Sequence, residues 1–75
     1  MPKKQDMFAE RLRFIREMRE MSQSDVDKAA GFAPSQTAHF EGGRRKPSFD
    51  NLRALCKALV VSADYLLSLS ERVTR

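Results

Sequence analysis

The stretch AGFAPSQTAHFEGGRRKPS, Ala30–Ser48, contains most of the signals that decide the fold of this 75-residue chain. Gly31 ends one helical pattern, because glycine tolerates the left-handed conformation of a helix terminus. Pro34 opens the next pattern, since proline lacks the N–H group that would be unpaired at the first helical position. The double glycine at 42–43 ends that pattern after about Glu41. The stretch therefore predicts a short helix between two glycine breaks, followed by a basic loop.

A second short helix is expected just upstream of this stretch, over Gln23–Ala30. Ser22 is followed three residues later by Asp25, which resembles a capping box with Asp in the place of the usual Glu. In such a box each of the two side chains binds the backbone N–H group of the other residue. Because Gly31 ends this helix and the next begins shortly after it, the sequence predicts two short helices joined by a tight turn.

The flanking sequence predicts three further helices, so the expected fold class is all-α, a compact five-helix bundle. The first helix runs from Met7 to Arg19 with Asp6 as its N-cap. Ser48 and Ser62 are the N-caps of the last two helices. Apolar residues three and four positions apart give each helix a face for the core. The residues expected in the core are Phe8, Leu12, Phe14, Ile15, Met18, Met21, Val26, Ala30, Phe32, Phe40, Leu52, Leu55, Cys56, Leu59, Tyr65, Leu66 and Leu69.

Composition limits the class of protein. A net charge of +4, with 41% hydrophobic and 32% charged residues, is typical of one small folded domain. We expect a loose basic tail at 1–5, the folded domain at 6–69 and a C-terminal tail at 70–75. The single cysteine excludes an intramolecular disulfide, and with a single histidine it makes a metal site unexpected. No segment resembles a signal peptide or a membrane span, so we expect a cytoplasmic protein with no membrane partner.

The same inventory disfavours an enzyme. The sequence has no cluster of convergent acidic residues and no glycine-rich loop of the kind that holds phosphates, so we expect no catalytic residue and no cofactor. The excess of positive charge instead favours a polyanionic partner.

From Phe8 to Leu69, the chain resembles the helix-turn-helix domains of the phage-repressor type, as in the lambda, 434 and Cro proteins. The residues that carry the resemblance, in order and at the family's spacing, are Ser22-Gln23, Gly31, Glu41-x-Gly43, Pro47-Ser48 and Leu59-x-Val61-Ser62-x-x-Tyr65-Leu66-Leu67. Two short helices joined by a glycine-containing turn are also the helix-turn-helix pattern itself. The resemblance implies a lambda-repressor-like fold, in which the second helix of the pair enters the major groove and the first crosses the DNA backbone.

The resemblance further implies a bacterial or phage-encoded transcriptional regulator that binds double-stranded DNA sequence-specifically. It implies a repressor that binds an inverted-repeat operator as a homodimer, since dimers bind half-sites a helical turn apart. Dimerisation would use Leu66, Leu67 and Leu69, together with Val73. The alternative for these leucines is that they belong to the core of the chain itself, with Leu67 the best candidate for an exposed one. The alternative is an antitoxin of the same fold, which binds a toxin protein as well as its own operator. The few residues from Ser70 onward leave little room for a toxin-binding extension, which favours the plain regulator.

The resemblance places the base-reading residues at the start of the Pro34–Glu41 helix and one turn later, which are Pro34, Ser35, Gln36 and His39. Glutamine binds adenine through two hydrogen bonds, and serine donates to either kind of base. His39 would donate to a guanine N7 or contact a phosphate, whereas Pro34 offers only packing against a thymine methyl. The alternative is that these are solvated residues on an exposed helix.

Phosphate contacts are expected on both sides of that helix. Gln23 matches a family glutamine that reaches a phosphate from the head of the second helix, where the helix N-terminus also attracts anions. Arg44, Arg45 and Lys46 are candidates by charge and by their place next to the groove helix, because phosphate contacts supply much of the affinity for DNA. The alternative for these three residues is an ordinary solvated loop.

The resemblance also implies an ion pair between Arg16 and Glu41 that positions the groove helix. The chain departs from the family at Asp27 and Thr37, where small apolar and Ile or Val residues are usual. We therefore expect the Asp27 carboxylate to accept a hydrogen bond from the Thr37 hydroxyl or from nearby backbone, because an unpaired carboxylate there would be costly. Val60 stands where the family often has glycine, so we expect the fourth helix to end differently in this chain.

Overall fold

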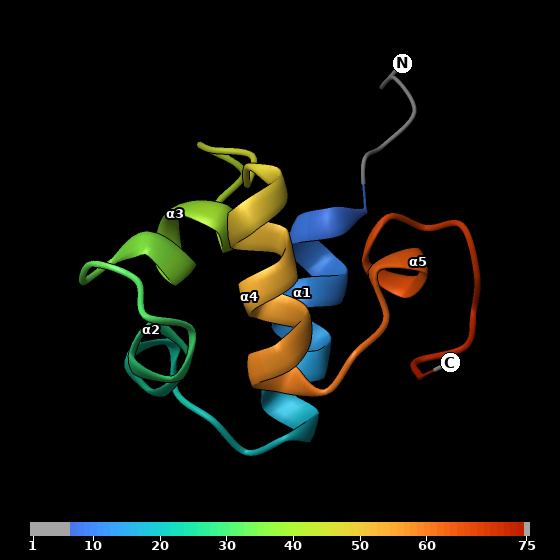
Figure 1. The fold of residues 1–75 in the computed structure, drawn as a ribbon, viewed down its shortest axis with the longest axis horizontal. Coiled ribbons are helices and arrows are strands. Elements are labelled where there is room, and N and C mark those ends of the chain that lie inside the picture. The colour runs from blue at the N-terminus through green and yellow to red at the C-terminus, as the bar shows by residue number, and fades with distance from the viewer. Residues whose placement is uncertain (1–6, 75) are drawn as a thin grey trace.

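The computed structural model describes residues 7–74, and this part of the chain folds as five helices with no strand. The helices are α1 (Phe8–Met18), α2 (Gln23–Ala30), α3 (Gln36–Glu41), α4 (Phe49–Leu59) and α5 (Ala63–Leu66). α2 packs on α3 and α4, while α1 packs on α3 and α5, which also contacts α4. Figure 1 shows α2 and α3 at one side of the bundle and α5 at the other. The expected all-α five-helix bundle is confirmed.

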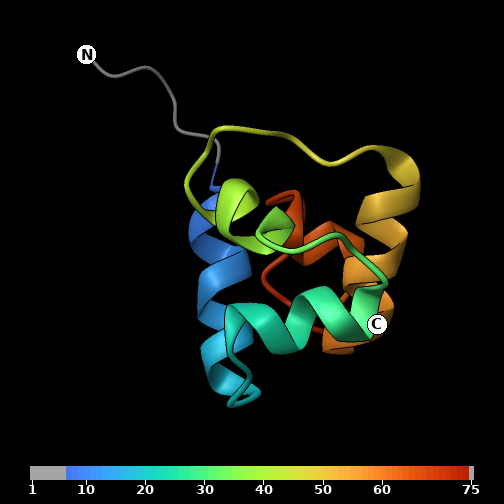
Figure 2. The same cartoon turned by 90° about the vertical axis from the view of Figure 1, so that its left-hand side faces the viewer.

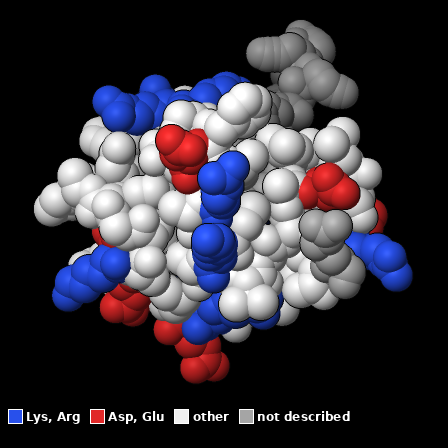
Figure 3. All heavy atoms as spheres, in the orientation of Figure 1, with Lys and Arg blue, Asp and Glu red and all other residues white. Residues whose placement is uncertain are grey.

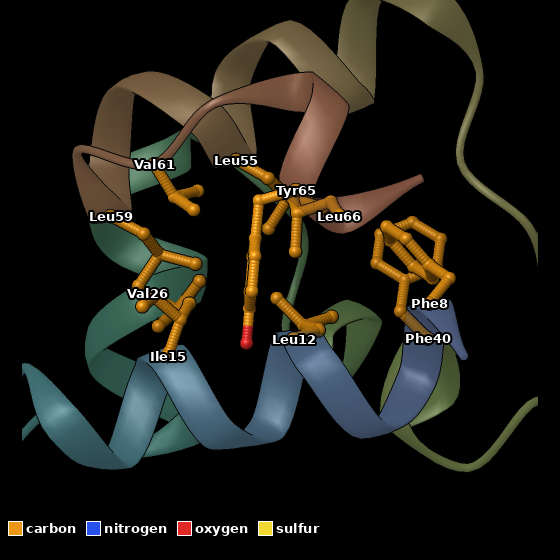
Figure 4. Close-up of a cluster of buried hydrophobic side chains, with 10 residues drawn as sticks. All are labelled: Phe8, Leu12, Ile15, Val26, Phe40, Leu55, Leu59, Val61, Tyr65 and Leu66. Atoms are coloured by element: carbon orange, nitrogen blue, oxygen red, sulfur yellow. The ribbon is translucent and has the colours of Figure 1, made fainter. Parts of the chain in front are cut away.

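The hydrophobic core lies where α1, α4 and α5 converge, with one residue each from α2 and α3 (Figure 4). Its buried members are Phe8, Leu12, Ile15, Val26, Phe40, Leu55, Leu59, Val61, Tyr65 and Leu66. Met21, Phe32, Leu52, Cys56 and Val73 are partly buried against this cluster. Burial raises the pKa of the Cys56 thiol, so the cysteine behaves as a small apolar residue. Most of the expected core is therefore present.

The prediction that a second apolar stripe of α1 lies in the core is wrong. Phe14 is 51% exposed and Met18 is 52% exposed, although both were expected in the core. The reason is tertiary, because the helices that pack on α1, mainly α3 and α5, leave this second stripe uncovered. The first stripe carries Phe8, Leu12 and Ile15, all of which are buried.

Three of the predicted helix starts are confirmed by side-chain caps. The Ser22 hydroxyl accepts from the backbone N–H of Asp25 at 2.9 Å, and the Asp25 carboxylate accepts from the N–H of Ser22 at 2.9 Å. These bonds with Ser22, led by the one from its backbone N–H, lower the pKa of Asp25. Ser48 and Ser62 cap α4 and α5 in the same way. At the start of α1 the cap position is Met7, and the predicted cap Asp6 lies outside the described residues.

The predicted start of the third helix is wrong by two residues. α3 begins at Gln36 rather than Pro34, because Ser35 has a left-handed backbone with φ of 76° and Pro34 belongs to the turn before it. The helix ends where predicted, at Glu41. Gly43, with φ of 76°, permits this end, and the N–H of Arg44 reaches back to the carbonyl of His39 at 3.1 Å.

α5 is shorter than the pattern of leucines suggested. It ends at Leu66, and Ser68 has a positive φ of 65° that turns the chain away. Leu69, which was expected in the core, is instead 72% exposed. The segment after it folds back on the bundle, where the carbonyl of Val73 accepts from the N–H of Ser62 at 2.7 Å.

Two arginines hold chain segments together through backbone carbonyls. Arg11 donates to the carbonyls of Tyr65 at 2.8 Å and Ser70 at 3.0 Å, pairs with Glu71, and lies over the Tyr65 ring at 4.4 Å. Arg19 donates to the carbonyl of Leu59 at 2.7 Å, at the end of α4. Part of the positive charge therefore serves the fold and is not available to a polyanion.

The C-terminus of α4 contradicts the expectation that Val60 avoids a left-handed conformation. Val60 has φ of 53° and ψ of 57°, and its carbonyl accepts from Arg19 at 2.8 Å. A β-branched residue in this region is strained. The contacts that Arg19 makes with the carbonyls of Leu59 and Val60 hold the chain in this conformation.

Replacing Val60 with Gly is expected to raise the free energy of unfolding by about 1 kcal/mol. The gain is the relieved strain of about 1–3 kcal/mol, less roughly 0.5–1 kcal/mol for the greater freedom of glycine in the unfolded chain. Little burial is lost, since Val60 is 64% exposed. Urea denaturation measures the change. Val60→Ala is the control, because alanine keeps the Cβ atom but lacks the β-branch; an equal gain from alanine would show that the strain comes from the branch and not from the Cβ atom.

None of the helices in the range 7–74 has both the length and the apolar character needed to span a bilayer. Within the same range, no group of His, Cys, Asp and Glu side chains is arranged to hold a metal ion.

Candidate nucleic-acid interface

The α2–α3 pair forms one exposed face of the bundle, flanked by α1 and α4 (Figure 2). Gly31 ends α2 with φ of 76°, and the next N–H, of Phe32, returns to the carbonyl of Asp27 at 2.8 Å. The Phe32 ring then meets Phe40 edge-on, with 5.7 Å between ring centroids. These contacts fix the turn between the helices, so the start of α3 is presented at the surface.

The predicted base-reading residues occupy that surface to different degrees. Pro34 and Ser35 are exposed in the turn, whereas Gln36 and His39 are half-buried on α3. A hollow between the two helices lies beside them and is lined by Gln23, Ser24, Asp27, Lys28, Phe32, Pro34, Ser35 and Ala38.

Two residues of this hollow were missed from the sequence. Ser24 and Lys28 lie on α2, both exposed, and both line the hollow. Their spacing of four residues places them on one helical face, one turn apart. The signal was therefore present, but only the position of α3 shows which face of α2 it belongs to.

The predicted ion pair between Arg16 and Glu41 is present and joins α1 to α3. The guanidinium donates to both carboxylate oxygens, through Nε at 2.5 Å and Nη2 at 3.1 Å. It also donates to the carbonyl of Met21 at 2.9 Å. The hydrogen bond to Glu41 raises the pKa of Arg16. Since the Glu41 side chain is only 3% exposed, the pair is an internal tie rather than a surface contact.

Gln23 belongs to the same network. Its amide nitrogen donates to Glu41 Oε1 at 3.0 Å, so one of its two N–H groups is already engaged. The side chain is half-buried at the first residue of α2 and lines the hollow. Gln23 is thus held next to the interface by Glu41, an arrangement that the sequence did not indicate. A phosphate contact from its remaining N–H stays a prediction.

The basic loop after α3 is exposed, as expected for phosphate-binding residues. Arg44, Arg45 and Lys46 are all exposed, and Figure 3 shows basic atoms gathered along the edge where this loop lies in Figure 1. Arg45 Nη1 donates to Gln36 Oε1 at 3.3 Å, which joins the loop to a predicted base reader. The loop and the start of α3 therefore form one surface, which we call the α3 face (Pro34, Ser35, Gln36, His39 and Arg44–Lys46).

The expected hydrogen bond between Asp27 and Thr37 is confirmed. Thr37 Oγ1 donates to Asp27 Oδ1 at 2.6 Å, and the backbone N–H of Thr37 donates to the same oxygen at 2.8 Å. Asp27 Oδ2 accepts from the N–H of Ser35 at 3.0 Å. The two departures from the apolar pattern therefore compensate each other across the α2–α3 crossing.

The predicted dimerisation residues do not form one surface. Leu66 is fully buried in the core of its own chain, and the structure corrects the prediction for this residue. The reason is that Leu66 faces inward from the last turn of α5, where it meets the core cluster. Leu67 is 48% exposed and Leu69 is 72% exposed, so both are accessible.

Comparison with known proteins identifies relatives of the whole bundle. A family model described as "Helix-turn-helix domain" matches residues 9–72. The HTH-type transcriptional regulator YobD of Bacillus subtilis (strain 168), itself uncharacterized, is 31% identical over 65 residues. The alignment covers 87% of this chain and 58% of YobD, so the chain spans little more than half of that relative.

Solved structures share the fold over most of the chain. The P22 c2 repressor in complex with the synthetic operator 9T superposes with a TM-score of 0.78 and 33% identity, covering 84% of this chain and 96% of the repressor chain. The restriction-modification controller protein C.AhdI from Aeromonas hydrophila superposes with a TM-score of 0.76 and 30% identity, covering 81% of this chain and 92% of the controller chain.

Proposed function

Because the chain belongs to the helix-turn-helix domain family and has the fold of a phage-type repressor, we propose that it binds double-stranded DNA sequence-specifically and regulates transcription. The observation that carries the proposal is the α3 face, where exposed Pro34 and Ser35 and half-buried polar side chains of α3 lie next to three exposed basic residues. In this arrangement α3 enters the major groove, and the loop contacts the flanking phosphates.

The finer proposal is a repressor that binds an inverted-repeat operator as a homodimer. Support comes from the similarity to the P22 c2 repressor, whose structure was solved with an operator. The exposed Leu67 and Leu69 lie beyond the end of α5 and are candidates for the contact between two subunits. One copy of α3 reads only a few base pairs, so two copies are needed for a long operator.

Selection from random duplex DNA at several salt concentrations, followed by sequencing of the bound pool, tests the function. We expect an enriched inverted repeat whose half-site centres lie about one helical turn, roughly 10 base pairs, apart. Enrichment of a single half-site would support sequence-specific DNA binding but contradict binding as a dimer. A bound pool with no enriched sequence would reject sequence-specific regulation.

Replacing Gln36 with Ala is expected to weaken discrimination at one base pair of the selected site by about 1–3 kcal/mol, because a bidentate base contact is lost. The salt dependence of binding should stay unchanged. Arg44→Ala is the matched contrast, since it should reduce the salt slope by about one and leave base preference intact. Arg44 is preferred to Arg45 here, because Arg45 contacts Gln36. If Gln36→Ala discriminates among variants of the site in the same ratios as the parent does, the assignment of Gln36 as a base reader is wrong.

A further inference from the structure

We propose that Asp27 is a positioning residue for the DNA-reading segment: it replaces the missing N-cap of α3, holds Ser35 in its left-handed conformation, and thereby sets sequence preference without touching DNA. The part of this inference that concerns DNA recognition rests on the proposed function. Its structural part, the control of Ser35 by Asp27, stands on the geometry alone.

The start of α3 has no cap of its own. Ser35 occupies the N-cap position, yet its side chain makes no cap hydrogen bond. The orphan N–H groups at this end are instead taken by a carboxylate from α2, with Ser35 N at 3.0 Å and Thr37 N at 2.8 Å from Asp27. A helix of six residues has little stability of its own, so an external cap matters more here than on a long helix.

The left-handed backbone of Ser35 depends on this cap. A positive φ is uncommon for a residue other than glycine, and φ at Ser35 is 76°. Pro34 and Ser35 are both exposed and belong to the α3 face, so the backbone conformation at Ser35 shapes that face. Such outliers persist where neighbouring contacts over-determine them, and they gather at binding sites. The hydrogen bond from Ser35 N to Asp27 Oδ2 is the contact that fixes this N–H.

Burial makes the contact difficult to replace by water. Asp27 is 6% exposed and Thr37 is fully buried. Among residues 7–74, no buried side-chain nitrogen or oxygen lacks a hydrogen-bond partner, so the carboxylate is satisfied as it stands. Loss of the acceptor would leave the N–H of Thr37 without a partner in a dry site.

Because Asp27 is negatively charged, its neutralisation should change specific and non-specific DNA affinity in different ways. A carboxylate beneath a surface that meets phosphates opposes DNA binding, so its neutralisation should hold or raise non-specific affinity. If Asp27 positions the reading segment, the same neutralisation should lower affinity for the selected site. A purely structural loss would instead lower both affinities by the same factor, through the fraction of folded protein.

The experiment is Asp27→Asn, measured on the selected duplex and on a scrambled duplex at several salt concentrations. The amide keeps one acceptor for Thr37 but turns an N–H group toward Ser35 N, where no acceptor remains. We expect at least a tenfold fall in the ratio of specific to non-specific affinity, with non-specific affinity unchanged or higher. Circular dichroism corrects for the folded fraction, and Asp64→Asn on α5 controls for net charge. A preserved ratio overturns the proposal.

A double-mutant cycle separates positioning from direct contact. Glycine adopts a positive φ without strain, so Ser35→Gly should make the conformation independent of Asp27. In the Ser35→Gly background, we expect Asp27→Asn to change the affinity ratio by less than twofold. Thr37→Val removes only the hydroxyl donor and leaves both backbone contacts, so its ratio should also stay within twofold. A tenfold fall in either case would contradict the assigned role of the Ser35 contact.

Nuclear magnetic resonance of the free protein tests the role of Asp27 without DNA, and therefore independently of the proposed function. The nuclear Overhauser effect between the amide and α protons of Ser35 reports φ, because these protons lie closer together at a positive φ than at a negative one, and hydrogen exchange reports the protection of Ser35 N–H. We expect both to change in Asp27→Asn and to persist in Asp64→Asn. If selection from random DNA enriches no sequence, the proposed function is wrong, but the signals of Ser35 still test the role of Asp27. Signals of Ser35 that stay unchanged in Asp27→Asn reject that role.

Discussion

Arg16→Met lowers the free energy of unfolding by about 3–5 kcal/mol, as expected when one partner of a buried ion pair is removed. The substitution leaves the Glu41 carboxylate, only 3% exposed, with the Gln23 amide as its remaining partner. Glu41→Leu should cost less than Arg16→Met, because Arg16 is 13% exposed and also lies 3.9 Å from the Glu17 carboxylate. Urea denaturation, with the slope compared between variants, measures both changes.

Two control variants distinguish the contribution of the Arg16–Glu41 pair from the contributions of the single residues. The double variant Arg16→Met with Glu41→Leu should recover most of the loss, since an apolar pair of similar volume leaves no stranded charge. Arg13→Met, an exposed arginine on the same helix, should change stability by no more than about 0.5 kcal/mol. Additive losses in the double variant would show that Arg16 and Glu41 act independently.

The pH dependence of this loss follows from the pKa of Arg16. The hydrogen bond to Glu41 raises that pKa in the folded state, and the contribution is therefore complete at any pH below its value in the unfolded chain. It disappears only when the pH rises through the raised pKa. The loss caused by Arg16→Met should therefore be equal at neutral and at moderately alkaline pH.

Local signals predicted the helix ends well wherever the partners lie close in sequence. The start and end of α2 follow from the Ser22–Asp25 box and Gly31, and the structure reproduces both. The start of α3 was placed two residues early, because the Asp27 carboxylate reaches Ser35 across the turn and holds it outside the helix. The departures at Asp27 and Thr37 predict a contact between the two helices, but no local pattern indicates that the N–H of Ser35 is one of its donors.

The residues of the candidate site could largely be predicted from the sequence, but the groups that they contact could be predicted less well. The resemblance gave the Arg16–Glu41 pair, which the structure contains. It did not give Arg11, whose acceptors include the distant carbonyls of Tyr65 and Ser70, because every residue carries a carbonyl and none is marked in the sequence. Leu69 shows the converse limit, since periodicity predicts both Leu66 and Leu69 in the core and only Leu66 is buried there.

Phe40→Ala is expected to lower the free energy of unfolding by about 3–5 kcal/mol, which is most of the stability of a domain of this size. Phe40 is 1% exposed and lies on the core side of α3, where its ring meets Phe32 at 5.7 Å between centroids. Because α3 has only six residues, it is held by packing rather than by its own hydrogen bonds. Loss of this ring should therefore release the α3 face together with the core. Thermal denaturation should show a fall in Tm of more than 10 °C, at roughly 4–8 °C per kcal/mol.

Phe49→Ala is the matched control for Phe40→Ala. Both substitutions remove the same ring from a helix, but Phe49 is 88% exposed at the start of α4. Its removal should change stability by no more than about 0.5 kcal/mol. Phe40→Leu should keep most of the packing and cost less than about 1.5 kcal/mol, since it nearly conserves volume. If Phe49→Ala destabilised the protein as much as Phe40→Ala, burial of the Phe40 ring would not be what anchors α3, and the geometry of the α3 face would need another support.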